Sequence, residues 1–276
     1  MTDLTHLTIA ELRDVLISSD ASRPRSRQVR LGPSELGTAC QQQIARKLAG
    51  APRRPVTAPT WAPFQGTAVH AEMEKVVDHW NTSLGRTRWL AEDTLTVDPG
   101  IGGVEAITGH GDAYDLDHQM VVDWKHVGTT ALNKLRTAQR LGKPADQQVS
   151  PEYRVQAHLY GLGHERKGRP VRHVRLVLLA RSWQYDDSAE WTEEYRPDVA
   201  HAAVLRYYAT HDLLTALGVA DRPGFITGVP ATPSGDACKW CPFHRPGQPS
   251  DWDGCAGDTA AHGRRVDRFT DGLIAP

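Results

Sequence analysis

Three segments in the middle of the chain alternate apolar and polar residues, and this alternation constrains the fold more than any other feature. RWLAEDTLTVD, EAITGHGDAYDLD and QMVVDWKHV each follow the period of two that is typical of half-buried β-strands. Turn sequences separate them, with Pro-Gly-Ile-Gly-Gly before the second segment and Asp-His-Gln before the third. We therefore expect three consecutive strands that form a meander.

Helical periodicity flanks this meander on both sides. The spacing of apolar residues predicts, in chain order, helices at Ser34–Leu48 and about Gly66–Trp80, helices at about Thr130–Leu141 and Pro151–Gly161, the strands VRHVRLVLLAR and EWTEEYR, and a helix at about Pro197–Leu217. This order favours an α/β fold with a mixed central sheet flanked by helices.

The composition excludes some classes of protein and leaves others open. The 276 residues carry 32 Lys and Arg against 33 Asp and Glu, so the net charge of −1 gives no overall signal for nucleic acid. A local basic groove would nevertheless be enough to bind DNA. The N-terminus lacks a basic segment followed by an apolar run, and no apolar run reaches about 18 residues. We expect a cytoplasmic protein without a membrane span.

The segment VVDWKHV, residues 121–127, places a carboxylate and an ammonium on one face of an apolar strand. Side chains alternate across a strand, so Asp123 and Lys125 point to the same side and Trp124 to the other. An internal ion pair and a catalytic site both explain this pattern.

A second aspartate favours the catalytic interpretation. Asp112, in ITGHGDAYD, lies beside Asp123 if the connection Asp115–Met120 joins their strands as a hairpin. Two neighbouring carboxylates repel each other unless a cation lies between them, and their oxygens suit Mg²⁺. With Lys125 orienting a water or stabilising a phosphate, the set suits metal-assisted phosphodiester hydrolysis. On its own, Asp-x-Lys is common, and Gly-Asp is also ordinary turn chemistry.

Two helical motifs flank these aspartates in the sequence. His70, in GTAVHAEME, lies on the predicted helix before the meander, with Glu74 one turn later on the same face. Gln156 and Tyr160, in VQAHLYG, share a face of a later helix, where they could meet a phosphate or orient Lys125. The alternatives are a surface histidine and an interfacial tyrosine with a hydrogen-bonding glutamine.

The four cysteines indicate a metal site. Cys238, Cys241 and Cys255 follow the spacing C-x2-C-x13-C, and Cys40 lies about 200 residues earlier. In a reducing compartment, clustered cysteines are more often metal ligands than disulfide partners. Together with His244, the three C-terminal cysteines form a self-contained zinc set that leaves Cys40 free.

The motifs G-x-x-x-H, G-D, D-x-K and Q-x-x-x-Y occur here in one order. This order, together with the cysteines, resembles the RecB-like branch of the PD-(D/E)XK nuclease superfamily. The resemblance runs from Ser34 to Cys255 and is closest to the iron–sulfur exonucleases related to CRISPR-associated RecB-type nucleases and to phage-encoded recombination exonucleases. It implies a restriction-endonuclease-like core at residues 64–218, between an N-terminal helical segment (1–63) and a cysteine-rich segment (219–276).

The resemblance also implies roles for individual residues. His70, Asp112 and Asp123 would bind Mg²⁺ or Mn²⁺ together with the backbone carbonyl of Trp124, and Lys125 would position the attacking water. Gln156 and Tyr160 would shape the site around the DNA strand. The Pro-Asp of the superfamily is Gly-Asp here, which keeps the carboxylate.

In the related exonucleases, one cysteine before the core and three after it bind a [4Fe–4S] cluster. The matching residues are Cys40, Cys238, Cys241 and Cys255, which would tie an N-terminal helix to a C-terminal loop. This interpretation uses all four cysteines, and zinc is the alternative.

The implied function is a metal-dependent exonuclease acting on single-stranded DNA or duplex ends, in recombination or repair in a host or a phage. Its partners would be DNA and a recombination or single-strand annealing protein. The arginines that could guide the DNA backbone are Arg23, Arg25, Arg27, Arg30, Arg53 and Arg54. The alternative is a non-catalytic DNA-binding or adaptor module with the same fold; a degenerate relative would be expected to have lost one of the charged residues, and all are present.

Overall fold

The computed structural model describes residues 11, 13–15, 31–54, 61–182 and 184–257. Its centre is a five-stranded sheet in the order β1-β2-β3-β4-β5, formed by β1 (Trp89–Asp98), β2 (Ile107–Asp115), β3 (Met120–Val127), β4 (His173–Ala180) and β5 (Ala189–Glu194). The β3–β4 pair is parallel and the other neighbouring pairs are antiparallel. The predicted meander and the mixed α/β fold are confirmed.

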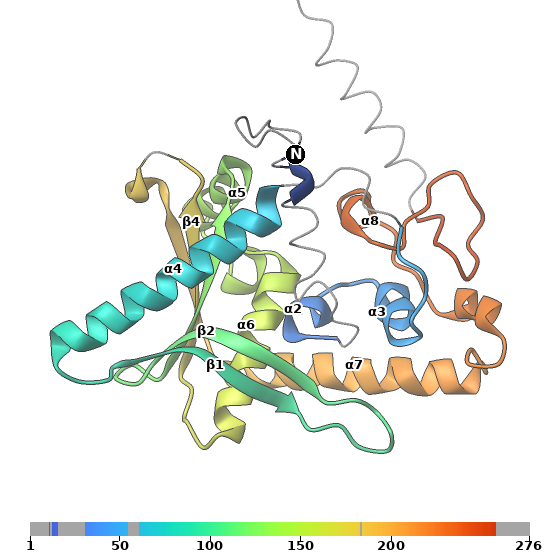
Figure 1. Ribbon diagram of the computed structural model, residues 1–276, viewed down its shortest axis with the longest axis horizontal. Helices are drawn as coiled ribbons and strands as arrows, with labels where there is room; N and C mark the ends of the chain where they lie inside the picture. Colours follow the sequence, from blue (N-terminus) through green and yellow to red (C-terminus); the bar gives the residue numbers. More distant parts are fainter. Residues whose placement is uncertain (1–10, 12, 16–30, 55–60, 183, 258–276) are drawn as a thin grey trace, which may run out of the picture.

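Helices cover both faces of this sheet (Figure 1). They are α2 (Pro33–Leu36), α3 (Gln41–Leu48), α4 (Trp61–Leu84), α5 (Thr129–Arg140), α6 (Pro151–Arg166), α7 (Pro197–Ala216) and α8 (Gly235–Trp240), with short 3-10 turns at η1 (Ala145–Gln147), η2 (Tyr185–Asp187) and η3 (Pro223–Gly228). Alternation along β3 assigns the two faces: Val122 and Trp124 pack with Met73 of α4. Val121 packs with Tyr160 of α6.

The predicted helix at Ser34–Leu48 is wrong as a single element, because the chain forms two helices there. α2 ends at Leu36 and α3 begins at Gln41, so Cys40 caps the start of α3 instead of lying inside a helix. The break occurs where Gly37 packs against α6: a Cβ at this position would lie 2.4 Å from the Cα of Glu152. The backbone therefore passes α6 at a distance that only glycine allows.

The helix predicted at Pro151–Gly161 continues to Arg166. Its glycines are sites of close packing and do not end the helix. A Cβ on Gly161 would lie 2.4 Å from the ring of Tyr195, and one on Gly163 would lie 2.8 Å from the Cβ of Leu95. Tertiary contacts thus override the low helix propensity of glycine.

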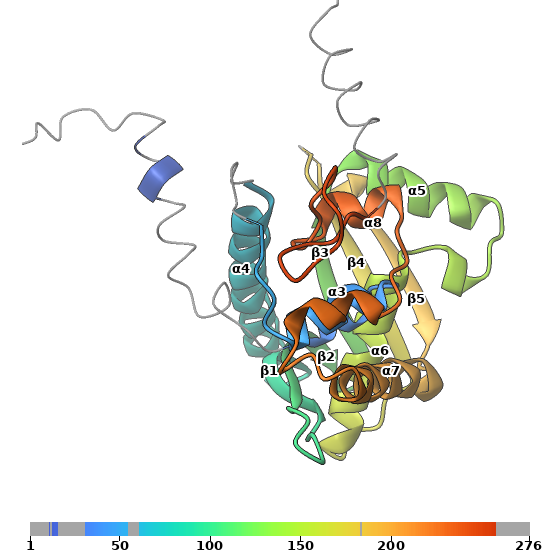
Figure 2. The same cartoon turned by 90° about the vertical axis from the view of Figure 1, so that its right-hand side faces the viewer.

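A second hydrophobic cluster forms beside the sheet, where the two ends of the described chain meet. It includes Ala45 of α3, Leu214 of α7, Ile226 of η3 and Phe243. In this region α3 packs against η3, which lies in front of it in Figure 2, with α8 above them. Among the described residues, no helix is both long and apolar enough to cross a membrane.

A fully buried arginine ties these two ends together. The guanidinium of Arg46, on α3, donates hydrogen bonds to the carbonyls of Asp251 (2.7 Å), Gly254 (2.8 Å) and Trp252 (3.1 Å). Three charge-assisted bonds offset part of the cost of burying this cation. They fix the loop that carries Cys255 against α3.

Candidate active site

The site forms where β2 and β3 separate. Their ladder ends at the pair Ala113–Val122, one residue before the two predicted aspartates. Beyond that pair, the backbone N–H of Trp124 donates to Oδ2 of Asp112 at 2.7 Å. At the fork, the carboxylate of Asp112 thus accepts the hydrogen bond that a backbone carbonyl would accept in a continued ladder. Asp112 lies next to Asp123, as the hairpin predicted from the sequence would place it.

Asp123 and Lys125 lie on the same face of β3 and form an ion pair. Nζ of Lys125 is 2.6 Å from Oδ2 of Asp123, whose side chain is fully buried. At this distance the ammonium is within hydrogen-bond reach of Oδ2, and no other described residue donates a hydrogen bond to either oxygen of Asp123. The internal ion pair considered for VVDWKHV is therefore present, and it leaves the carboxylate able to accept more contacts.

Burial shifts the proton equilibria of this pair. It raises the pKa of Asp123 to about 6, although the charge of Lys125 acts in the opposite direction. For Lys125, burial lowers the pKa, but the charges of Asp123 and Asp112 outweigh it and the net pKa is raised. Lys125 therefore keeps its proton at neutral pH and acts as a positive charge, not as a base. Its Nζ lies 5.4 Å from the ring centroid of Tyr153 on α6.

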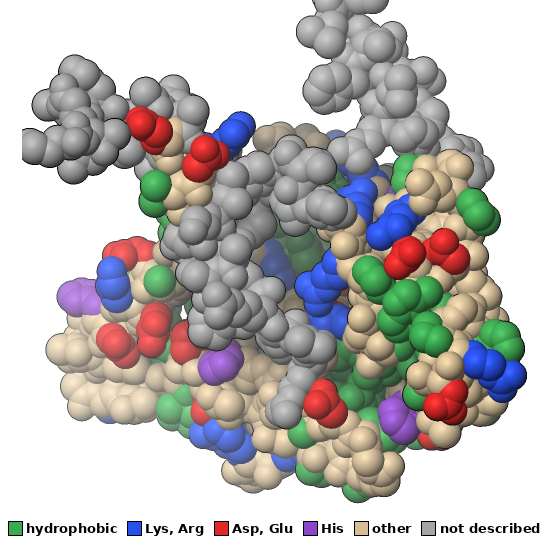
Figure 3. Space-filling view, turned by 45° about the vertical axis from the view of Figure 1, so that its right-hand side comes forward, with side chains coloured by type: hydrophobic (Ala, Val, Ile, Leu, Met, Phe, Trp, Pro, Cys, Tyr) green, Lys and Arg blue, Asp and Glu red, His purple; other side chains and the backbone are tan. Residues whose placement is uncertain are grey.

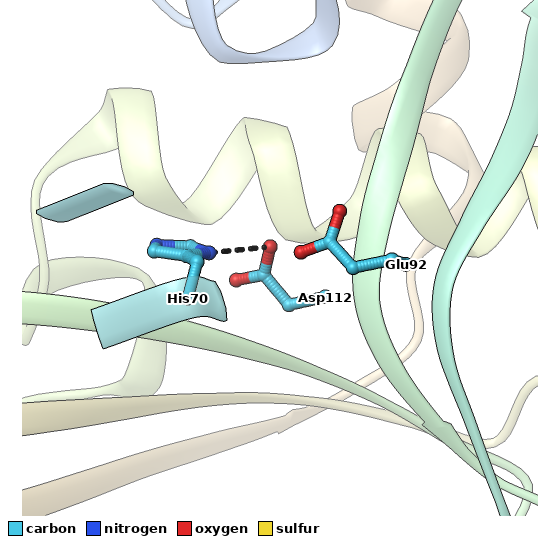
Figure 4. A group of neighbouring side chains, drawn as sticks. All are labelled: His70, Glu92 and Asp112. Carbon is cyan, nitrogen blue, oxygen red and sulfur yellow. Dashed lines mark hydrogen bonds and ion pairs between the residues drawn. The ribbon is translucent and has the colours of Figure 1, made fainter. Parts of the chain in front are cut away.

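His70 reaches the fork from α4. Its Nδ1 lies 3.1 Å from Oδ1 of Asp112, and Figure 4 shows the ring pointing at this carboxylate. The hydrogen bond to Asp112 raises the pKa of His70, against the effect of burial. Both oxygens of Asp112 are thus engaged, one by a histidine and one by the backbone.

Glu92, on β1, is the residue that sequence reasoning missed. One ligand atom from each of His70, Glu92 and Asp112 lies within 4.8 Å of the others. Figure 4 shows the three side chains pointing toward one another. Three oxygen and nitrogen donors at this spacing could hold a metal ion. Burial, and then the charge of Asp112, raises the pKa of Glu92.

The backbone explains how Glu92 enters this group. Its neighbours Ala91 and Asp93 pair with Ala113 and Gly111, which places Glu92 opposite Asp112. Glu92 itself has φ of +47°, a left-handed conformation that costs a non-glycine residue on the order of 1 kcal/mol or more. The only signal in the sequence was a glutamate inside an apolar strand.

Gln156 and Tyr160 lie on α6, as predicted, and are buried. Nε2 of Gln156 donates to the hydroxyl of Tyr160 at 3.1 Å. The aromatic ring beside Lys125 belongs to Tyr153, one turn earlier on the same helix, which the sequence did not single out. Contact of Gln156 and Tyr160 with DNA stays a prediction.

The four cysteines converge on one cavity beside α3 and α8. Cys40, Cys238, Cys241 and Cys255 line it, together with His244, and none of the four forms a disulfide. Burial, reinforced by the other three thiols, raises the pKa of Cys241 to about 11. Cys40 thus lies with the C-terminal cysteines despite the long separation in sequence.

We predict that Lys125→Met, studied in EDTA, loses about 3 kcal/mol of unfolding free energy at about pH 8, because it leaves a buried carboxylate without a counter-charge. The pKa of Asp123 in the folded state then rises further above its ordinary 3.8. An acid with a raised folded-state pKa stabilises less as the pH increases, so the loss should shrink towards about pH 5. Urea denaturation at both pH values measures this.

The exposed Lys134→Met on α5 is the matched control and should change little at either pH. The double variant Asp123→Leu/Lys125→Met should recover most of the stability. A loss that is equal at both pH values would contradict the prediction.

No family model matches the chain, and no curated protein is similar to it at a significant level. Solved structures give remote likenesses. An alkaline exonuclease from Laribacter hongkongensis is 17% identical, with 70% of this chain and 91% of that chain covered and a TM-score of 0.45. A protein named SSO0001 is 16% identical, with 84% and 94% covered and a TM-score of 0.49. A phage-related exonuclease from Haemophilus somnus is 10% identical, with 62% and 77% covered and a TM-score of 0.38. At these values the function has to be inferred from the side chains of the site.

Proposed function

We propose that this protein is a divalent-metal-dependent nuclease that hydrolyses phosphodiester bonds at DNA ends. The observation that carries the proposal is the convergence of Asp112, Asp123 and Lys125 at the fork of β2 and β3, with His70 hydrogen-bonded to Asp112. Carboxylates for a cation and an ammonium for a phosphate are what this hydrolysis needs in one place. The order of the sequence motifs supports DNA as the substrate and an exonuclease activity.

The residues present fit a magnesium or manganese ion. Carboxylate oxygens with a single imidazole are typical ligands for these cations. Asp123 is fully buried, its Oδ2 contacts the ammonium of Lys125, and its Oδ1 has no hydrogen-bond partner among the described residues, which leaves that oxygen available to a cation. His70, Asp112 and Asp123 would hold the ion with the carbonyl of Trp124, and Glu92 would join them. A bound ion of this kind polarises the phosphate and makes a water more acidic.

Other residues of the chain would position the groups that react. Lys125 stays protonated, so it would donate hydrogen bonds to a phosphate oxygen or hold the attacking water in place, and it would not accept the water's proton. Tyr153, packed beside the ammonium, limits the directions in which Lys125 can point. Trp124 holds Asp112 through its backbone N–H, so the position of that carboxylate is fixed by the sheet.

We expect the purified protein to degrade end-labelled DNA with Mg²⁺ or Mn²⁺ and not in EDTA. Asp123→Asn and Lys125→Met should lower the rate by about 10²-fold or more, because each removes a charge that acts on the transition state. Asp186→Asn, at an exposed position on η2, is the control and should cut like the wild type. Substrates labelled at the 5′ or the 3′ end report the polarity. No cleavage, or full activity in both variants, would leave the non-catalytic DNA-binding module as the better interpretation.

Glu92→Gln should raise the Mn²⁺ concentration needed for half-maximal activity roughly tenfold, because it removes an anionic donor near the ion. The rate at saturating Mn²⁺ should fall less than in Asp123→Asn. Direct titration of Mn²⁺ by electron paramagnetic resonance checks the affinity without activity. Asp78→Asn, exposed on α4 two turns after His70, is the control. Equal Mn²⁺ affinity in Glu92→Gln and the wild type would remove Glu92 from the metal site.

We also propose that the cysteine cavity holds a [4Fe–4S] cluster bound by Cys40, Cys238, Cys241 and Cys255. Four thiols around one cavity, none of them in a disulfide, match the ligand set of such a cluster. The cluster would join α3 to the C-terminal segment, next to the bonds made by Arg46. A zinc ion bound by the three C-terminal cysteines and His244 competes with this assignment, since His244 lines the same cavity.

Two variants separate iron from zinc. On anaerobic purification we expect a brown protein with about four iron atoms per chain. Cys40→Ala should lose the iron and the visible absorption, and His244→Ala should keep both. If zinc is the true ligand, the protein is colourless, Cys40→Ala keeps its metal and His244→Ala loses it. Metal analysis of the three proteins decides between these outcomes.

A further inference from the structure

A tryptophan in the cysteine segment is exposed to solvent. Trp240 ends α8 and has 70% of its surface accessible, whereas Trp191 is 1% exposed and Trp124 is 7% exposed. Cys238 and Cys241, which flank Trp240 in the sequence, both line the cysteine cavity. The backbone of this segment is therefore held in place, and the ring of Trp240 points outward. A single exposed ring does not by itself mark a contact surface, so the groups beside it decide what it can bind.

Positive charges surround this ring. Nζ of Lys239 lies 5.0 Å from the ring centroid of Trp240. The guanidinium of Arg54 donates to the carbonyl of Lys239 at 3.1 Å, and the backbone N–H of Arg54 donates to the carbonyl of Pro242 at 2.8 Å. Arg53 is the residue before Arg54; it is exposed and lines a neighbouring hollow with Glu35 and Lys47.

These charges have no acidic counterpart in the described part of the chain. Lys239, Arg53 and Arg54 form no ion pair with any residue that the structure describes. Figure 3 shows Lys and Arg side chains on this lobe, with Asp and Glu side chains beside some of them. The cations next to the ring are therefore not neutralised by ion pairs within the described residues, although the net charge of the whole chain is −1.

A flat aromatic face among unpaired cations fits single-stranded DNA. An unpaired base stacks on the ring, and the phosphates beside it meet the ammonium and guanidinium groups. In a blunt duplex the bases already stack on one another and offer no free face. We propose that Trp240, with Lys239, Arg53 and Arg54, is a base-stacking platform that holds a single-stranded end. The proposal rests on the proposed nuclease function for the choice of DNA.

Contiguous packing connects this platform to the fork. Residues of α8 and α3 line the same cavity, and Cys40 occupies the N-cap position of α3. The preceding helix, α2, packs on β2 at Gly109, which lies three residues before Asp112. A Cβ on Gly109 would lie 2.8 Å from the side chain of Pro33. The N-terminal segment that helps to build the cysteine cavity thus also packs on the strand that carries Asp112. The platform and the fork are therefore held by one scaffold.

The test is the affinity for a fluorescein-labelled oligo(dT), measured by anisotropy in EDTA so that no cleavage occurs. Trp240→Ala should raise the Kd about tenfold, and Trp240→Phe, which keeps a stacking ring, less than about threefold. Tyr185→Ala, which removes an equally exposed ring on η2, should leave the Kd unchanged. A blunt duplex should bind wild type and Trp240→Ala with the same affinity. Equal oligo(dT) affinity in Trp240→Ala and the wild type would overturn the platform.

Because Trp240 lies between two cysteines, a second measurement uses the unmodified chain. An oligonucleotide carrying 5-iododeoxyuridine, irradiated with the wild-type protein, should crosslink to Trp240 in peptide mapping. Crosslinks confined to other residues would overturn the platform even if Trp240→Ala binds weakly because its metal content has changed. Crosslinking at Trp240 without any metal-dependent cleavage would support the platform and refute the nuclease, so the two proposals fail separately.

Discussion

The candidate site depends on an ion pair buried in the central strand. Asp123 and Lys125 sit on β3, the middle strand of five, where α6 covers their face of the sheet. Removing two charges from water costs several kcal/mol, and the mutual attraction of a buried pair often repays this cost only in part. An apolar pair would stabilise the strand at least as well. The charged pair is therefore better explained by chemistry at the fork than by stability.

A second buried charge holds the other half of the molecule. Arg46 is as fully buried as Asp123, but its two terminal nitrogens donate to three carbonyls of the loop that precedes Cys255. The two charges are thus compensated differently. Arg46 is held by three backbone carbonyls, whereas Asp123 contacts the ammonium of Lys125. The carbonyls fix Arg46 in a structural role, and Asp123 keeps an oxygen that no described residue contacts with a hydrogen bond.

Local periodicity was enough to predict the centre of the site. Side chains alternate on every strand, so Asp123 and Lys125 had to share a face, and a hairpin of the predicted register had to bring Asp112 beside Asp123. Periodicity could not predict the contact of His70 with Asp112, because this contact depends on how α4 packs against the sheet. Only the order of the motifs indicated that contact. The arginines at 23, 25, 27 and 30 lie outside the described residues, and Arg53 and Arg54 lie beside α8.

Features that depend on tertiary contacts could not be predicted from the sequence. Glu92 joins the site through a left-handed residue in the middle of a strand, which no alternation pattern predicts. Gly37 breaks a helix because of the backbone of Glu152, more than a hundred residues away in the chain. Tyr153 lies beside Lys125 because α6 packs over β3. In each case the cause is a contact between segments that the sequence pattern treats separately.

The hydrogen bonds of Asp112 determine how the site must respond to a cation. Its Oδ2 accepts from a backbone N–H that the sheet keeps in place, and its Oδ1 faces Nδ1 of His70. The hydrogen bond to Asp112 raises the pKa of His70. If a cation binds through His70, as we propose, only the neutral ring can be its ligand, so a proton on the ring competes with the cation. The affinity for such a cation should then increase as the pH rises through the elevated pKa of His70.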